Sequence, residues 1–430
     1  MPLQLGRIVF LMTLVPGVLS SQGVREVYDQ HNRAAMAARG AGDWATVRRH
    51  AAAVDTLFNG NPATLMSFAR ASARMGDTLS ALQTVRAVVG MGVIRNLQAD
   101  EDLSPLRVHP EWASLIAANE ANAKSVGVTS SVFALPGLDF LAEDIVWDGA
   151  RGRYLVSSVR KGTVVAVGKD GRSVEVISGK TSGAWGMFAL AVDSARSFLW
   201  ATSVAMPHVE GFAAADSAKS AVLRFHLASG KLQKRYDLPK TRRGNSPGDV
   251  AIASDGSLYV ADSRSGVLYV IRPGADSLAV LVGEGTFMSP QQSAVSVDGR
   301  SLYVADYIRG LARVNIATRE VTWVAHPRNV ALSGIDGLVT VGPNRLVAIQ
   351  NGVLPNRVIG LTLNAAGSVV KATVIAQDTA SIREPTHGVL MGNDFHFIAN
   401  AGWDGFGDDG ALKKDHGLVP PVVLSVRVSF

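Results

Sequence analysis

The apolar residues of the chain follow two different periods. From residue 24 to about residue 126 they recur every three or four positions, as in Val47, Ala51 and Val54, which is the pattern of helices with one buried face. Beyond that point they alternate with polar residues in short runs, which is typical of β-strands. We therefore predict an all-α region over 24–125 followed by a mainly β domain.

The helical pattern contains a repeat. Gly42-Asp43 and Gly76-Asp77 stand about 34 residues apart, and each pair ends one helical pattern and opens the next. A helix–turn–helix period of about 34 residues resembles the tetratricopeptide repeat, although most of the signature aromatics of that repeat are missing here. A plain array of helical hairpins is the alternative. Either form offers a surface for a protein partner.

Two segments of the β region are near copies of each other. Residues 254–262 and 297–306 each contain a tight Asp-Gly turn and a strand rich in β-branched and aromatic residues. Weaker copies are found at four other places: Trp147–Val156, Val192–Thr202, Val341–Ile349 and Leu390–Asn400. The six copies lie roughly 43 to 60 residues apart, close to one four-stranded blade each. We therefore predict a six-bladed β-propeller over 135–430.

The ends of this β region suggest how the ring closes. The final run, residues 421–430, has the pattern of a strand of the last blade. If residues 133–138 add the outermost strand to that same blade, the ring is closed by strand exchange and no sheet edge is left open.

The N-terminus has the pattern of a secretory signal peptide. Arg7 is followed by an apolar run over 8–19 and by the small residues Ser20 and Ser21. We predict a signal peptide over 1–22, cleavage near Ser20–Gly23, and an exported product that is periplasmic or secreted. The chain has no cysteine, so an exported product must be stable in an oxidising compartment without disulfides. No later segment holds eighteen continuous apolar residues, so no membrane span is expected after signal removal.

Composition excludes two further classes of protein. Hydrophobic residues make up 47% of the chain and charged residues 18%, which excludes a disordered protein. The formal net charge is +6, but no basic run or interleaved aromatics accompany it, so no nucleic-acid partner is expected.

One inner-strand segment resembles a known family. Residues 141–148, Leu-Ala-Glu-Asp-Ile-Val-Trp-Asp, are similar to the Gly-Glu-Gly-Pro-x-Trp-Asp motif of the senescence marker protein, gluconolactonase and luciferin-regenerating enzyme family. Supporting pieces are Pro247–Ala251, Ser289–Ser293 and Ile335–Leu338. The resemblance covers roughly residues 135–430 and implies a six-bladed propeller.

The inner strands of a propeller all start at one end of the central channel, so the residues at their starts converge there. The aligned residues that open the six strands are Asp144, Ala189, Asp249, Gln292, Gly337 and Gly388, and those just before them are Glu143, Phe188, Gly248, Gln291, Asp336 and His387. Carboxylates crowd at such a mouth unless a cation or protons relieve them. Oxygen-rich ligation of this kind suits a hard divalent cation and a small-molecule ligand at the channel mouth. The glycine-rich loop over 404–410, together with Trp403, could overhang this mouth.

The family resemblance implies a role for several of these residues. The metal-binding Glu of the family falls on Glu143, a ligand Asn falls on Gln291, and the metal-binding Asp, also the proposed general base, falls on Asp336. Another ligand Asn is replaced by Gly248, which has no side chain. The remaining members are expected to be auxiliary ligands or substrate-binding residues: Asp144, Asp249, Gln292 and His387. Calcium is the first expectation for the metal, with magnesium, manganese or zinc as alternatives.

Two classes of function remain open. The resemblance implies a metal-dependent lactone hydrolase, in which a bound cation polarises a lactone or small ester and Asp336 removes a proton from water. No motif for a covalent nucleophile, a phosphate loop or a zinc protease is present in the sequence. Because Gly248 removes one ligand, a non-catalytic propeller that binds a ligand or a protein partner is the alternative.

Overall fold

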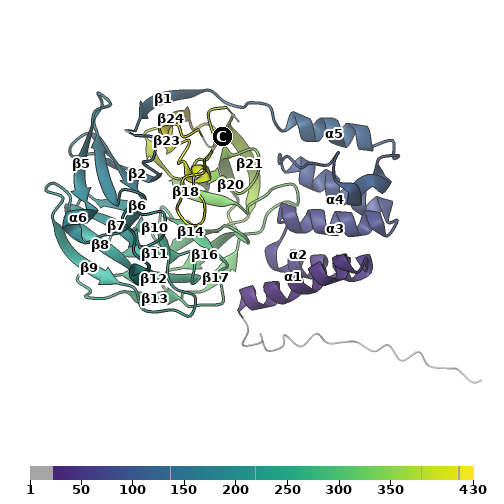
Figure 1. Ribbon diagram of the computed structural model, residues 1–430, viewed down its shortest axis with the longest axis horizontal. Coiled ribbons are helices and arrows are strands. Elements are labelled where there is room, and N and C mark those ends of the chain that lie inside the picture. The colour runs from purple at the N-terminus through teal and green to yellow at the C-terminus, as the bar shows by residue number, and fades with distance from the viewer. Residues whose placement is uncertain (1–22, 136, 218, 379, 415–416) are drawn as a thin grey trace, which may run out of the picture.

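The computed structural model describes residues 23–135, 137–217, 219–378, 380–414 and 417–430, and it divides into a helical region and a ring of sheets (Figure 1). The predicted signal peptide lies outside the described residues. The helical region contains α1 (Val24–Gly40), α2 (Trp44–Phe58), α3 (Pro62–Arg74), α4 (Thr78–Gly90), a 3₁₀ turn η1 (Glu101–Leu106) and α5 (Trp112–Ala121). Within the described residues, no helix is both long enough and apolar enough to cross a membrane.

The recurring Gly-Asp pairs are the junctions between antiparallel helices. Gly42 and Gly76 have φ of 73° and 80°, a left-handed conformation in which glycine carries no steric penalty. The side chains of Asp43 and Asp77 then accept the backbone N–H groups of Thr46 and Ser80 at the starts of α2 and α4, which satisfies donors that the helix leaves open. The described helices are few, so the tetratricopeptide assignment is not supported.

The predicted six-bladed propeller is confirmed by six sheets of four antiparallel strands each. Blades 1 to 3 are built by β2 (Ala142–Asp148), β3 (Arg153–Ser158), β4 (Thr163–Val167) and β5 (Ser173–Ser178); by β6 (Gly186–Asp193), β7 (Phe198–Val204), β8 (Ser220–His226) and β9 (Leu232–Asp237); and by β10 (Pro247–Ile252), β11 (Leu258–Asp262), β12 (Val267–Ile271) and β13 (Ala279–Val282).

Blades 4 and 5 continue the ring, and blade 6 joins the two ends of the β region. They are built by β14 (Pro290–Val295), β15 (Ser301–Asp306), β16 (Gly310–Asn315) and β17 (Val321–Trp323); by β18 (Ile335–Gly342), β19 (Arg345–Gln350), β20 (Arg357–Leu363) and β21 (Val369–Gln377); and by β22 (Gly388–Met391), β23 (Asp394–Ile398), β24 (Val422–Arg427) and β1 (Thr129–Ala134). Short turns of helix, α6 (Gly179–Ser182), η2 (Ala214–Asp216) and η3 (Trp403–Gly405), lie in the connections.

Blade 6 closes the ring by strand exchange. Strand β1 pairs antiparallel with β24, with Phe133 opposite Val423, so the outermost strand of the last blade comes from the N-terminal side of the propeller. The predicted closure is therefore found, but the predicted range of 133–138 for this strand is wrong. The strand begins earlier and ends at Ala134, because its register is decided by β24 and not by its own apolar pattern.

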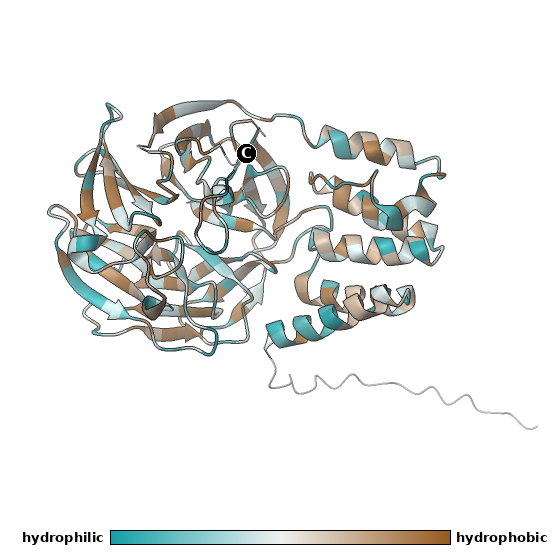
Figure 2. Ribbon diagram, in the orientation of Figure 1, coloured by the Kyte–Doolittle hydropathy of each residue, from teal (hydrophilic) through white to brown (hydrophobic). Residues whose placement is uncertain are grey.

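The cores lie between neighbouring blades. Figure 2 shows hydrophobic residues along most of the propeller strands, and the central strands of the blades are buried on both faces. Between blades 1 and 2, for example, Leu155, Leu199 and Phe225 belong to one buried cluster. Such packing fixes each blade against the next and holds the inner strands in a ring.

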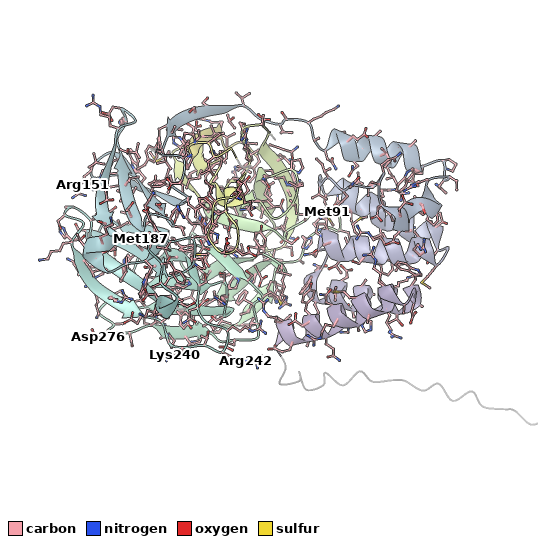
Figure 3. The ribbon with its side chains drawn as sticks, viewed as in Figure 1. Met91, Arg151, Met187, Lys240, Arg242 and Asp276 are labelled. Carbon is pink, nitrogen blue, oxygen red and sulfur yellow. The ribbon has the colours of Figure 1, made fainter. Side chains whose placement is uncertain are left out.

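The helical region packs against one side of the propeller at the end where the inner strands begin. The backbone N–H of Ile94 donates to the carbonyl of Leu354 at 2.6 Å, and the buried Arg357 donates to the carbonyl of Gly92 at 2.8 Å. Met91, at the boundary between the two regions in Figure 3, shares an apolar cluster with Ala331 and Val353. The loops that make these contacts connect strands at the channel-mouth end of the ring.

Candidate functional site

The inner strands β2, β6, β10, β14, β18 and β22 lie side by side around the channel. Five of them carry a break in register against their neighbouring strand, close to the start of the inner strand. In β2 the break lies between Ala142 and Ile145, and in β18 between Ile335 and Leu338. A bulge of this kind re-aims the side chains at that point. The residues predicted from the sequence therefore lie where the strands depart from regular pairing.

Burial separates these residues into two tiers. Glu143, Gln291 and Asp336 keep some exposed surface, as does Gly248. The other predicted polar members are buried: Asp144, Asp249, Gln292 and His387. The first set therefore forms the accessible tier of the channel mouth, and the second set lies behind it.

Two residues of the buried tier connect neighbouring blades. The carboxylate of Asp144 accepts the backbone N–H of Ile145 at 2.7 Å and that of Leu190 in blade 2 at 2.6 Å. The amide oxygen of Gln292 accepts the backbone N–H of Leu338 in blade 5 at the corresponding place. Burial raises the pKa of Asp144 to about 6. Both side chains satisfy N–H groups that the bulges leave without a strand partner.

Asp249 and His387 form a buried ion pair across the channel. The Nε2 of His387 lies 2.7 Å from the Oδ1 of Asp249, and its Nδ1 lies 2.9 Å from the backbone carbonyl oxygen of Glu143. The Nε2–Oδ1 contact is an ion pair at short distance without hydrogen-bond geometry, and a carboxylate so close to the ring favours the positively charged imidazolium. Burial lowers the pKa of His387, but the carboxylates of Asp249, Asp144 and Asp336 outweigh it and raise the pKa well above its ordinary value.

Glu143 lies in the accessible tier under the indole of Trp403. The Nε1 of Trp403 donates to the Oε2 of Glu143 at 2.8 Å, and the Trp403 ring contacts the rings of Phe188 and His208. Burial raises the pKa of Glu143 to about 8, with a further contribution from the carboxylates of Asp336 and Asp249. Glu143 is therefore protonated at neutral pH.

Asp336 lies in the same tier on blade 5. Its Oδ2 accepts a hydrogen bond from the Nδ2 of Asn351 at 2.7 Å. Burial raises the pKa of Asp336 to about 6, helped by the carboxylate of Asp249 and opposed by the imidazolium of His387. Asp336 is therefore mostly ionised at neutral pH, unlike Glu143.

Sequence reasoning missed the residues that hold Asp336. Asn351 also donates to the carbonyl of Pro385 at 2.8 Å, and its Oδ1 accepts the hydroxyl of Tyr307 at 2.9 Å. Asn351 and Tyr307 each directly follow the second strand of a blade, β19 and β15. Because that strand is antiparallel to the inner one, its end lies beside the start of the inner strand. A sequence alignment of the residues that follow each second strand would therefore have indicated Asn351 and Tyr307.

Glu384 is a further, partly buried carboxyl group near the mouth that the sequence did not indicate. Its Oε2 accepts the backbone N–H groups of Gly402 and Asp404 at 3.1 and 3.2 Å, so it holds the start of the loop that carries Trp403. Burial raises the pKa of Glu384 to about 7.

The accessible tier does not form a preassembled metal shell. Within the described ranges, no three His, Cys, Asp or Glu side chains gather in a way that could hold a metal ion. Glu143 and Asp336 each accept a hydrogen bond from a neighbour, and the amide of Gln291 donates to Ser289 at 3.0 Å. At Gly248, an added Cβ would find its nearest neighbours, Gln291 and Ser263, only at 3.9 Å, so a side chain would fit at this position but none is present.

Comparison with known proteins finds solved structures that are similar to the propeller in fold alone. No protein-family model and no curated protein matches the chain. Among solved structures, a gluconolactonase from Xanthomonas campestris has a TM-score of 0.46 and 13% identity, covering 67% of this chain and 86% of its own. A luciferin-regenerating enzyme has a TM-score of 0.48 and 12% identity, covering 70% and 95%. Virginiamycin B lyase from Staphylococcus aureus has a TM-score of 0.46 and 15% identity, covering 64% and 82%. At these scores and identities the likeness carries no argument about chemistry.

Proposed function

We propose that the channel mouth is an acid–base site that opens a lactone or a similar small ester. Asp336 acts as the general base and Glu143 as the general acid. The observation that carries the proposal is that these two carboxyl groups share one channel mouth while their pKa values are pushed apart, to about 6 and about 8. Two carboxyl groups held in different protonation states at one pH are the arrangement that acid–base catalysis requires.

The reaction follows from the protonation states at neutral pH. The ionised Asp336 removes a proton from a water molecule as the water oxygen attacks the ester carbonyl carbon. The tetrahedral intermediate then collapses, the ring C–O bond breaks, and the proton of Glu143 passes to the departing alkoxide oxygen. One water is consumed and a hydroxy acid is formed. Transfer of the proton from Asp336 back to Glu143, directly or through water, restores the site.

Neighbouring residues keep the two carboxyl groups in these roles. Asn351 donates to Asp336 and is itself oriented by Tyr307, so one oxygen of Asp336 is held while the other remains to accept a proton. Trp403 donates to only one oxygen of Glu143, which leaves the other for the proton. The imidazolium of His387 supplies a positive charge behind both groups.

The divalent cation implied by the family resemblance forms no part of these steps. Its expected ligands are Glu143, Gln291 and Asp336, but with glycine at 248 and no cluster of three His, Cys, Asp or Glu side chains among the described residues, they do not form a preassembled shell. Binding of calcium would require Glu143 to lose its proton. Metal binding at this mouth thus stays a separate prediction, tested together with the activity.

A non-catalytic ligand-binding propeller is the second candidate, and Gly248 favours it. Without a side chain at that position, the accessible tier has one fewer group to hold a substrate or an ion than the ligand set of the family that the sequence resembles. Such a propeller would bind a small molecule at the mouth without turning it over.

The test uses the full chain and a panel of γ- and δ-lactones and simple esters. The rate of hydrolysis is measured by pH-stat titration of the acid released. We expect Asp336→Asn and Glu143→Gln each to lower the rate by about 10² or more, the usual contribution of a positioned acid or base. Asp276→Asn is the matched control, because Asp276 is exposed and lies on the outer surface in Figure 3.

Three outcomes would contradict the proposal. Equal rates for the wild type and both site variants would remove the two carboxyl groups from the reaction. No hydrolysis of any substrate, with a lactone still bound, would leave the ligand-binding propeller. Hydrolysis only after loading with calcium, magnesium, manganese or zinc would replace the acid–base assignment by the metal-dependent one.

A further inference from the structure

A pocket of about 230 Å³ lies among α1, α2 and α3 of the helical region. Its lining includes His31 and Asn32 from α1, His50 from α2, and Thr64 from α3. The pocket is on the helices and does not include any residue of the channel mouth. The two histidines are its distinguishing feature.

The imidazoles of His31 and His50 face each other through the same ring atom. Their Nδ1 atoms lie 2.8 Å apart, their ring centroids are 5.1 Å apart, and the ring planes are inclined by 53°. Both rings are only partly buried. Two Nδ1 lone pairs cannot face each other unless one nitrogen carries a proton or an ion lies between them.

The backbone around the pair is held by packing. Tyr28, one turn before His31, contacts the ring of Phe58 on α2 with centroids 5.1 Å apart. Val54 and Phe58 belong to a buried cluster that includes Met288 of the propeller. The two histidines are thus presented by elements that cannot separate freely, and only their side-chain torsions need to adjust to a ligand.

The spacing is close to that required for chelation. Imidazole nitrogens bind zinc at about 2.0–2.1 Å, so two of them on one ion stand roughly 3 Å apart. The 2.8 Å separation therefore needs only a small widening and rotation of the rings.

We propose that His31 and His50 form a two-imidazole site for a borderline divalent transition metal such as copper, nickel or zinc. Imidazole selects these ions over calcium and magnesium, which prefer oxygen. Among the described residues no third His, Cys, Asp or Glu joins the pair. The remaining coordination positions are therefore filled by water in the pocket, with the polar side chains of Asn32 and Thr64 on its walls. The site is open and exchangeable, and it is independent of the chemistry at the channel mouth.

The probe is Cu²⁺, added to the tag-free full chain and followed by electron paramagnetic resonance, with Zn²⁺ and Ni²⁺ measured by calorimetric titration. We expect one equivalent of Cu²⁺ with hyperfine coupling to two imidazole nitrogens, and affinities in the order Cu²⁺ above Ni²⁺ and Zn²⁺. His31→Gln and His50→Gln should each lower the affinity by about tenfold or more and leave coupling to a single imidazole. His226→Gln, on β8 of the propeller, is the control and should change nothing.

The results of these experiments distinguish a metal site from a histidine pair that only shares a proton. If no ion binds, or if both Gln variants bind copper as the wild type does, the metal site is refuted and the pair only shares a proton. Circular dichroism and the melting temperature of each variant show whether the helices remain folded. Loss of binding in a variant that is folded by these measures supports the proposal. If both variants unfold, titration of the wild type at pH 5 and pH 7.5 decides, because an imidazole site must weaken by about tenfold or more as its ligands protonate.

Discussion

The protonated Glu143 makes stability at alkaline pH the most informative property to measure. A carboxyl group whose pKa is raised by folding binds its proton more tightly in the folded state. Its contribution to stability is complete below the ordinary pKa of 4.5 and is lost as the pH rises through about 8. The variant Glu143→Gln keeps a neutral group of the same size that can still accept the Trp403 hydrogen bond. Its stability relative to the wild type should therefore rise steadily between about pH 4.5 and about pH 8 and level off above that.

The size of this gain follows from the pKa. A change from 4.5 to about 8 corresponds to an upper value of about 5 kcal/mol, at 1.36 kcal/mol for each pH unit. Glu143 keeps some exposed surface, and solvent screens part of the cost of its charge. We therefore expect the free energy of unfolding of Glu143→Gln, relative to that of the wild type, to be about 2–3 kcal/mol higher at pH 9 than at pH 4.5.

The assay is urea denaturation at pH 4.5, 7 and 9, followed by tryptophan fluorescence and by circular dichroism. The quantity to compare is the difference in free energy of unfolding between variant and wild type at each pH. Any effect of the substitution on packing is the same at all three pH values and therefore does not change this comparison. Asp276→Asn serves as the control for an exposed carboxylate. A constant difference at the three pH values would show that folding does not raise the pKa of Glu143, and the assignment of Glu143 as the general acid would fall with it.

Two further predictions concern the residues around this site and the closure of the ring. Because the Trp403 hydrogen bond lowers the pKa of Glu143, Trp403→Phe should move the alkaline limb of the pH–rate profile upward; an unmoved limb would show that another group supplies the proton. Phe133 is buried on β1 and contacts Tyr154 of blade 1, so Phe133→Ala should destabilise the propeller by about 3–5 kcal/mol in urea denaturation; a loss below about 1 kcal/mol would mean that β1 contributes little to closure.

The architecture was predictable because its signals are local. The Asp-Gly turns before Leu258 and Ser301 mark inner hairpins within a few residues of sequence, and the repeated Gly-Asp junctions mark helix ends in the same way. The bounds of β1 were not predictable from local pattern, since its partner β24 lies at the other end of the propeller. A strand whose register is imposed by a remote neighbour carries little of that information in its own residues.

The site was predictable only in part, for the same reason. Strand starts are visible in the sequence, so the spacing of the repeats alone is enough to place Glu143 and Asp336 at one channel mouth. Whether each side chain faces the channel or the neighbouring blade depends on the bulges, which place Asp144 and Gln292 against backbone N–H groups of the next blade. The donors Asn351 and Trp403 come from loops after other strands, and no short-range pattern connects them to the acids they contact.

The strand exchange in blade 6 also sets the order in which the protein can be completed. Strand β1 precedes all the other blade strands in the chain, yet its partner β24 ends the last blade, so the first strand to leave the ribosome must wait for the last. Pairings of such long sequence separation form slowly, and until then β1 and the growing sheets present open edges that invite pairing with other chains. A chain that stops short of Val422 would leave β1 without a partner and the ring unclosed, whatever the quality of its other five blades.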